Sequence, residues 1–331
     1  GSLTKTEIKK AIRPNEKSEV ISNETILPDW AMGWCYIEKM NQFYHIDSAY
    51  SIIKDAFNAR FNRMVECREA GMPASTLTID YWSMPTYADL MYWPEAGRVF
   101  KYKGQTYLNS YSPSTLELRA PGSTSEQEAI QFIENHFKTI ISNDGDRSVL
   151  LDWLSYVYRN PGKRVNWSPV LQGAQGIGKT FISVMMTTLM GSGNSSTLDG
   201  STISATEYNE WAEGKVLCVV EEVRVGGSNK YEVMDRIKPF ITNSIISIRE
   251  KYRSVRVVPN FTNYLFITNH KDAIPIDRDD RRYAIIYSGL QSKDELMAVV
   301  GEHDRGKTYF NRLFSIVNNH PDLIGHWLKN R

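Results

Sequence analysis

Residues 168–190 constrain the fold of this chain more than any other stretch. Residues 168–171 are a short apolar run, residues 173–180 read G-x-x-x-x-G-K-T, and residues 181–190 are an apolar segment of helical length. A strand, a glycine-rich loop and a helix, in that order, are the context in which this pattern binds phosphate. A chance match in a chain of this length has a probability on the order of one per cent. The segment therefore predicts an α/β nucleotide-binding core rather than a glycine-rich turn without a ligand.

Each residue type in this loop has a chemical reason. Glycines let backbone N–H groups surround phosphate oxygens, and the following helix directs its positive end at the same anion. Lys179 can reach the β- and γ-phosphates of ATP, and the Thr180 hydroxyl can ligate Mg²⁺. The residues predicted to bind the nucleotide are Gly173, Ala174, Gln175, Gly176, Ile177, Gly178, Lys179, Thr180 and Phe181.

The chain as a whole has the character of a globular protein. Its 331 residues exceed one ordinary core, so two or three domains are expected. Its net charge is only +1, so any nucleic-acid contact must come from local clusters. Cys35, Cys67 and Cys218 are widely spaced, which predicts neither a disulfide framework nor a metal site and favours a reducing compartment.

The chain carries no sign of a membrane segment. No apolar run has the length of a membrane span, and no signal-peptide pattern opens the sequence. We therefore expect no membrane partner and a cytoplasmic location. The opening Gly1-Ser2, without methionine, indicates an expression scar and a piece of a longer protein.

Composition divides the chain into five predicted regions. They are a linker or arm at 1–28, an accessory α+β domain at 29–122, a helical platform at 123–164, a P-loop ATPase domain at 165–290, and C-terminal helices at 291–331. The accessory region is rich in aromatic residues, which could stack on bases. Packing in a small core is favoured, because aromatic side chains mostly serve packing.

Local patterns give further expectations. Residues 49–57 have apolar residues at helical spacing. Ser125 or Thr124 is expected to cap a helix that begins at Glu126. The glycine- and serine-rich stretch 191–200 is typical of a loop, and residues 205–212 predict a short helix.

Two acids follow the next buried strand. Residues 215–223 are an apolar run that ends in acids, typical of a parallel strand whose carboxyl end lies at a ligand crevice. Glu221 would hold Mg²⁺ through water, and Glu222 would polarise the attacking water. The alternative is a strand end whose carboxylates only face solvent. The P-loop about forty residues upstream favours the catalytic interpretation.

Three more groups of polar residues follow. A predicted hairpin over 245–258 carries Lys251, Tyr252 and Arg253 at its tip, which suits a phosphate contact with stacking beside it. A solvated hairpin end is the alternative. Asn269, near the end of another buried strand, can hydrogen-bond the γ-phosphate or the attacking water.

Arg281 and Arg282 precede the predicted strand 283–287. Arginines at such a position are ordinarily surface charges. In an oligomeric ATPase, an arginine there can reach the γ-phosphate bound by a neighbouring protomer and stabilise transition-state charge.

This ordered set of motifs resembles the superfamily 3 helicases, the hexameric helicases of small DNA viruses, phages and plasmids. It looks most like the C-terminal helicase part of phage and plasmid primase–helicases. The specific motifs cover about residues 168–287, and the likeness is looser upstream. Glu221 departs from the aspartate common in P-loop enzymes. Its longer side chain still suits a water-mediated Mg²⁺.

The resemblance implies an AAA+-like P-loop NTPase fold that uses ATP and Mg²⁺ and assembles into a homo-oligomeric ring, expected to be a hexamer. Lys251 corresponds to the hairpin lysine that contacts single-stranded DNA, and Asn269 to the sensor asparagine. Arg282, with Arg281 second, corresponds to the arginine that acts on the neighbouring protomer. The primase or polymerase segment of such proteins has no counterpart here. A phage-encoded protein of this kind would act in the host cytoplasm.

The leading hypothesis is an ATP-driven, ring-forming DNA helicase or translocase in viral, phage or plasmid DNA replication. One alternative is a nucleotide-gated initiator or scaffold that binds DNA without processive unwinding. Such a scaffold does not need both acids at 221–222. Measured ATP turnover would distinguish it from a helicase. The other is a P-loop kinase for a small metabolite. Monomeric behaviour and ATPase activity unaffected by single-stranded DNA would favour the kinase.

Overall fold

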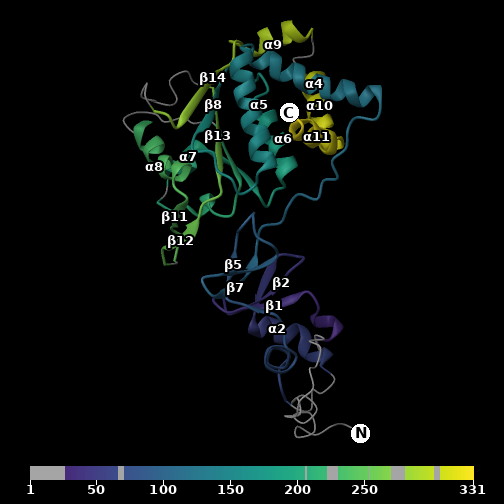
Figure 1. The fold of residues 1–331 in the computed structure, drawn as a ribbon, viewed down its shortest axis with the longest axis vertical. Coiled ribbons are helices and arrows are strands. Elements are labelled where there is room, and N and C mark those ends of the chain that lie inside the picture. The colour runs from purple at the N-terminus through teal and green to yellow at the C-terminus, as the bar shows by residue number, and fades with distance from the viewer. Residues whose placement is uncertain are drawn as a thin grey trace. The chain divides into compact units, whose positions relative to one another are not determined.

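The structure, a computed structural model, forms two compact units (Figure 1). It describes residues 27–65, 71–205, 207–221, 230–252, 254–269, 280–301 and 306–331. The linker predicted at the N-terminus is outside these ranges except for its last two residues, and so are Cys67, Glu222 and Arg253. The first unit comprises the described residues up to 92 with 96–110, and the second comprises 93–95 with the described residues from 111 onward.

The first unit contains two small sheets and short helices. One sheet has the order β3-β2-β1-β4 and the other β5-β7-β6. The strands are β1 (Trp34–Ile37), β2 (Gln42–His45), β3 (Tyr50–Ile53), β4 (Thr86–Tyr87), β5 (Leu90–Met91), β6 (Val99–Tyr102) and β7 (Gln105–Asn109). The α-helices are α2 (Lys54–Phe61) and α3 (Ala74–Thr76).

Aromatic side chains build the core of this first unit. Trp34, Phe43 and Phe57 are buried, and the rings of Phe43 and Phe57 stack with their centroids 3.8 Å apart. Buried rings are unavailable to bases, so the packing interpretation of these three residues is confirmed. The helical spacing expected over 49–57 is wrong in its first half. Residues 50–53 pair with β2 as an antiparallel strand, and the helix begins only at Lys54.

The second unit is built on a parallel sheet of five strands in the order β14-β8-β13-β10-β9. The strands are β8 (Ser168–Gln172), β9 (Ser195–Asp199), β10 (Leu217–Glu221), β13 (Asn263–Thr268) and β14 (Tyr283–Tyr287). All five carboxyl ends therefore meet at one edge of the sheet, where ligands of open α/β sheets bind. A separate antiparallel hairpin pairs β11 (Ile245–Ile248) with β12 (Arg256–Pro259).

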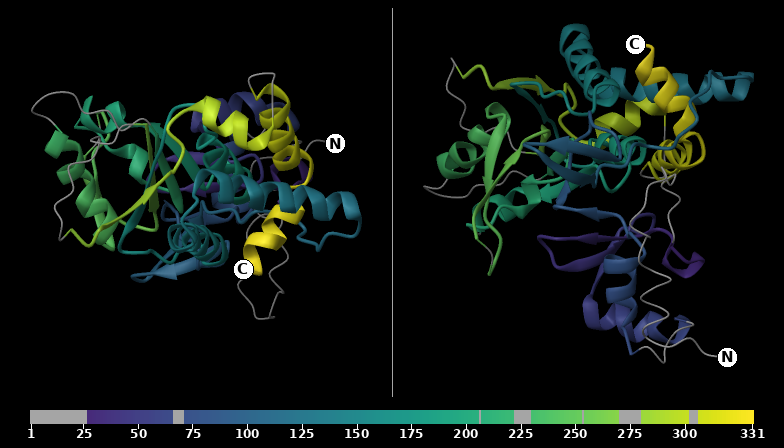
Figure 2. Two further views of the ribbon diagram at one scale, coloured as in Figure 1. Left: turned by 90° about the horizontal axis from the view of Figure 1, so that it is seen from above. Right: turned by 60° about the horizontal axis from the view of Figure 1, so that its bottom comes forward.

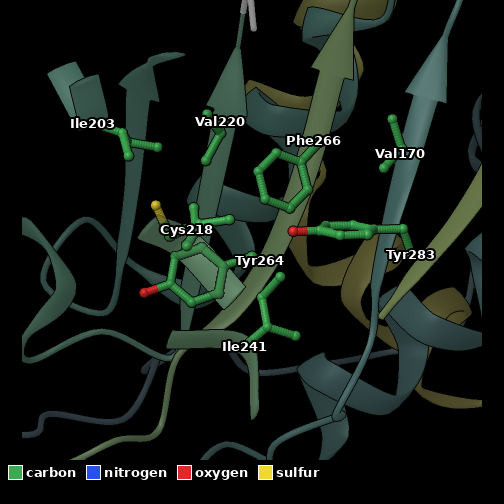
Figure 3. Close-up of a cluster of buried hydrophobic side chains, with 9 residues drawn as sticks. Val170, Ile203, Cys218, Val220, Ile241, Tyr264, Phe266 and Tyr283 are labelled. Atoms are coloured by element: carbon green, nitrogen blue, oxygen red, sulfur yellow. The ribbon is translucent and has the colours of Figure 1, made fainter. Parts of the chain in front are cut away.

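Helices cover both faces of this sheet (Figure 1). Helices α7 (Gly200–Ala205) and α8 (Lys230–Thr242) lie on one face, and α5 (Asp144–Arg159) and α6 (Thr180–Met190) lie on the other. Figure 3 shows Val220 of β10, Phe266 of β13 and Tyr283 of β14 in one buried cluster with Ile203 of α7 and Ile241 of α8. Alternate residues of each strand face this cluster, as the pleat of a strand requires.

The remaining helices pack together on the α5–α6 side. They are α4 (Thr124–Ile140), α9 (Lys293–Val300), α10 (Lys307–Asn319) and α11 (Pro321–Lys329). The C-terminal helices, yellow in Figure 2, lie against α4, α5 and α6. The N-cap of α4 is Ser123, whose side chain accepts from Glu126 N, so the cap expected at Ser125 or Thr124 is wrong. Asn143 is the N-cap of α5, and its side chain accepts from Asp146 N.

Two sequence expectations between α6 and β10 are wrong. The predicted loop at 191–200 contains the edge strand β9, which pairs with β10. The predicted helix over 205–212 is replaced by α7, which ends at Ala205, and a 3₁₀ turn at Glu210–Ala212. The sequence of β9, Ser-Ser-Thr-Leu-Asp, has one apolar side chain because an edge strand is only partly covered.

The last residues of the first unit are 96–110, and the segment 111–122 belongs to the second unit. This segment carries Pro121-Gly122 at its end and is held by the second unit at both of its ends. Asn194 Nδ2 donates to the carbonyl of Ser112 at 2.6 Å. Arg119 forms ion pairs with Glu126 and Asp322, each at 2.7 Å. The turn composition at 121–122 lies directly before the N-cap of α4.

Candidate functional site

The glycine-rich loop connects β8 to α6 at the carboxyl edge of the sheet. Gly176 and Gly178 have φ angles of +81° and +92°, which favour glycine. A Cβ on Gly178 would also lie 2.6 Å from His136 Cε1, and one on Gly173 would lie 2.6 Å from Ser288 Cβ. The loop is therefore fixed both by backbone conformation and by close packing, as the sequence pattern requires.

Lys179 lies inside the loop and is 5% exposed. Its ammonium donates to the carbonyls of Gly173 and Ala174 at 2.8 and 2.6 Å, and to Asn269 Oδ1 at 2.7 Å. Burial lowers the pKa of Lys179 to about 8, and the nearby Glu221 carboxylate opposes that shift. The structure thus brings together Lys179 and Asn269, which are 90 residues apart in the sequence.

Glu221 ends β10 at the same edge of the sheet. Glu221 pairs in register with Ile267 of β13, which lies two positions before Asn269. Its carboxylate accepts a hydrogen bond from the Ser183 hydroxyl on α6. Thr180, the first residue of α6, is exposed at the mouth of the loop. Glu222, the second predicted acid, lies outside the described residues.

These groups line a pocket of about 330 Å³. Its walls are formed by Gln175, Gly176, Gly178, Lys179, Thr180, Phe181, Glu221, Ile267, Asn269, Lys293, Phe310 and Phe314. Lys293 of α9 and Phe310 and Phe314 of α10 come from the C-terminal helices, and sequence reasoning missed all three. The i, i+4 spacing of the two phenylalanines on an amphipathic helix reads as ordinary core packing and gives no local signal of a pocket.

His136 was also missed, although its position inside the apolar face of α4 was a signal. It is fully buried, with Nδ1 2.9 Å from the Tyr309 hydroxyl and Nε2 3.3 Å from the carbonyl of Gly178. Burial lowers its pKa to about 4, and the contact with Gly178 opposes the shift. A neutral imidazole therefore joins α4, the glycine-rich loop and α10.

The His136 pKa predicts a pH dependence of stability. In the unfolded chain a histidine titrates near 6.5, so between about pH 6.5 and pH 4 the unfolded state binds more protons. The free energy of unfolding should fall across this window as the pH falls, by up to about 3 kcal/mol from this residue. Denaturant unfolding at pH 7, 5.5 and 4.5 measures it. The His136→Gln variant should lose less stability over the same range. Equal losses for the two proteins would contradict the assignment.

Arg281 and Arg282 directly precede β14, at the amino ends of the strands, whereas the glycine-rich loop lies at their carboxyl ends. The carbonyl of Arg282 accepts from Ser168 N, at the start of β8, whereas the loop follows the end of β8. A five-residue strand spans roughly 16 Å. Arg282 pairs with Asp280 at 3.2 Å, and Arg281 is exposed. Neither is placed to contact a ligand in the pocket of its own chain.

The β11–β12 hairpin is anchored at its base and exposed at its tip. Ile246 and Ile248 pack with Ala212, and Arg256 is paired with Glu213 and Glu250. The tip carries Lys251 and Tyr252, a residue that is 92% exposed.

The Lys251 ammonium lies 5.1 Å from the centre of the Tyr252 ring. No acid of the described residues pairs with Lys251. Arg253, the third predicted tip residue, lies outside those residues.

Comparison with known proteins gives partial matches. A family of unknown function (DUF5906) matches residues 171–282. The DNA primase-polymerase of Nitratiruptor phage NrS-1 is 22% identical over 206 residues, which are 62% of this chain and 28% of that protein. An apo structure of the NrS-1 C-terminal region has a TM-score of 0.69 at 17% identity, covering 90% of this chain and 66% of that one. Its A form gives 0.66 at 18% identity, covering 88% and 63%.

The chain is thus related in sequence to a phage primase-polymerase and shares the fold of the NrS-1 C-terminal region. It spans about a quarter of the length of that primase-polymerase. Within the described residues, no helix combines the length and the apolar character that crossing a bilayer requires.

Proposed function

We propose that this chain is a P-loop ATPase of the superfamily 3 type that drives movement on single-stranded DNA during phage DNA replication. The observation that carries the proposal is the convergence of Lys179, Asn269 and Glu221 on one pocket at the carboxyl edge of a five-stranded parallel sheet. The sheet order supports the proposal. Strand β8, which leads into the glycine-rich loop, lies inside the sheet between β14 and β13, so the loop lies beside the carboxyl end of β13, which Asn269 follows. The sequence relationship to a phage primase-polymerase supports the replication context.

The residues at the pocket fit a magnesium-bound nucleotide. Amides of the loop and Lys179 would hold the phosphates, and Lys179 would exchange its bonds to the loop carbonyls for phosphate oxygens. Thr180 and Glu221 would hold Mg²⁺, which neutralises charge that develops on the phosphates. Asn269 would bond the γ-phosphate or the attacking water. Glu222 is proposed as the group that orients that water.

Ring assembly is proposed because the arginine pair cannot act within its own chain. With Arg281 and Arg282 at the far edge of the sheet, either could serve the pocket only of an adjacent protomer. Mass photometry with and without an ATP analogue and single-stranded DNA tests this. A nucleotide-dependent oligomer, expected to be a hexamer, would support the ring. A monomer under every condition would exclude it.

The hairpin is proposed to grip the DNA strand. Lys251, which has no acidic partner in the described part of the chain, supplies a cation and Tyr252 supplies an exposed ring, the two contacts that non-specific single-strand binding uses. ATPase activity stimulated by single-stranded DNA would support a helicase over a metabolite kinase. ATP binding without turnover would favour the nucleotide-gated scaffold.

Replacing Lys251 with alanine should uncouple ATP turnover from movement. The lysine is far from the pocket in sequence and projects from a separate hairpin, so ATPase activity without DNA should persist. Strand displacement should fall by about tenfold or more, and the salt dependence of DNA binding should weaken by about one unit of slope. A fluorescent unwinding assay measures this, with Lys138→Ala, an exposed lysine of α4, as the control. Normal unwinding by the Lys251 variant would refute the role.

A further inference from the structure

Lys293, the first residue of α9, lies directly over the glycine-rich loop. A Cβ built on Gly176 would meet Lys293 Cδ at 3.2 Å and Lys293 Cβ at 3.4 Å. The aliphatic part of the lysine therefore packs on the loop backbone, and Lys293 lines the same pocket as Lys179.

The position of α9 is fixed by the loop itself. Ile177, fully buried, packs in one cluster with Leu296 and Met297 of α9. The N-terminus of α9 is capped by Ser292, whose side chain accepts from Glu295 N. A helix held by the loop and capped at its start presents its first side chain at a defined place, which is what a preorganised binding residue needs.

The charge of the pocket points to an anionic ligand. Lys179 and Lys293 are two cations, and Glu221 is the one carboxylate among the described lining residues. That carboxylate already accepts from Ser183. The described residues supply no acid paired with Lys293; its ammonium lies 5.7 Å from the centre of the Phe310 ring. A focused positive potential in a small cavity favours a polyphosphate over a neutral molecule.

We infer that Lys293 is a second phosphate-binding cation, supplied in cis by the C-terminal helices, and that Phe310 beside it forms the wall for the nucleoside. The ligand class is a nucleoside 5′-diphosphate or triphosphate. This inference rests on the proposed ATPase function and adds a binding residue that the P-loop pattern does not contain. It also gives the C-terminal helices a place in the nucleotide site, since Lys293 and Phe310 come from two consecutive helices.

The test compares nucleotide binding by lysine variants of two neighbouring helices. Lys293→Met keeps the aliphatic packing on Gly176 and removes the charge. Lys307→Met is the matched control, because Lys307 is the exposed first residue of α10 and does not line the pocket. Titration calorimetry with Mg²⁺ and ADP or a non-hydrolysable ATP analogue should show affinity weakened by about tenfold or more in the Lys293 variant, as expected for loss of one charged hydrogen bond. Adenosine binding should be unchanged.

The outcomes separate the inference from the function it rests on. Loss of affinity for both phosphorylated ligands in Lys293→Met, with near-normal affinity in Lys293→Arg and Lys307→Met, supports it. Equal binding by wild type and Lys293→Met overturns it and leaves the ATPase proposal standing. No nucleotide binding by the wild type would instead remove the proposed function. Unchanged melting temperature of the variant excludes unfolding as the cause.

Discussion

Lys179→Ala should reduce ATP turnover by a factor of about 10² to 10³, the usual loss when one preorganised charge-stabilising group is removed. The ammonium is buried and held by Gly173, Ala174 and Asn269, so its position is set before a ligand arrives. An ammonium already held at the loop has only to exchange its carbonyl partners for phosphate oxygens, so little reorganisation is needed for it to stabilise charge that develops on phosphate.

The same substitution leaves two carbonyls and an amide oxygen without their donor, so its stability must be checked separately. Lys179→Met fills most of the same space without the charge, so it tests the contribution of the charge alone. Steady-state phosphate release measures turnover, and thermal unfolding shows whether each variant is folded. A folded Lys179→Met protein with wild-type turnover would contradict the assignment of this pocket as the ATPase site.

Replacing both Arg281 and Arg282 with alanine should lower kcat by about 10³-fold, the lower end of the effect of an arginine that acts on a neighbour's phosphate. Nucleotide affinity of an isolated protomer should change little, since both residues lie at the edge of the sheet away from its own pocket. Single variants separate the two, because Arg282 is paired with Asp280 whereas Arg281 is exposed.

The control for this double variant is Arg63→Ala, an exposed arginine of the first unit. Turnover and mass photometry are measured on the same samples. Loss of turnover with the oligomer intact is the expected outcome. Full turnover by the intact double variant would rule out catalysis by these arginines.

The parallel sheet was predictable from the sequence, except for the edge strand β9. The inner strands β10 and β13 contain continuous buried apolar runs at 217–220 and 264–267, and β14 has the predicted bounds. Strand β9 was missed because its pairing with β10, not its side chains, makes it a strand. Likewise, Ile52 and Ile53 fit a helical spacing locally, and pairing with β2 decides the outcome.

The site was predictable where a motif carries it and not elsewhere. The glycine-rich loop, Glu221 and Asn269 each sit at the end of a recognisable strand, and parallel strands bring such ends to one edge. Ser183 of α6 contacts Glu221, His136 of α4 contacts the loop at Gly178, and Lys293 of α9 lines the pocket. Only the tertiary arrangement brings those helices together, so a single sequence holds no spacing rule for them.

Mixing two inactive variants tests most directly whether ATP is hydrolysed at the junction of two protomers. Lys179→Ala lacks a working pocket but keeps the arginines, and Arg281→Ala/Arg282→Ala keeps the pocket but lacks the arginines. In a randomly mixed ring of equal parts, about one junction in four combines an intact pocket with intact arginines, so about a quarter of wild-type turnover should return. A mixture no more active than its two components, in rings shown to exchange subunits, would contradict a shared site.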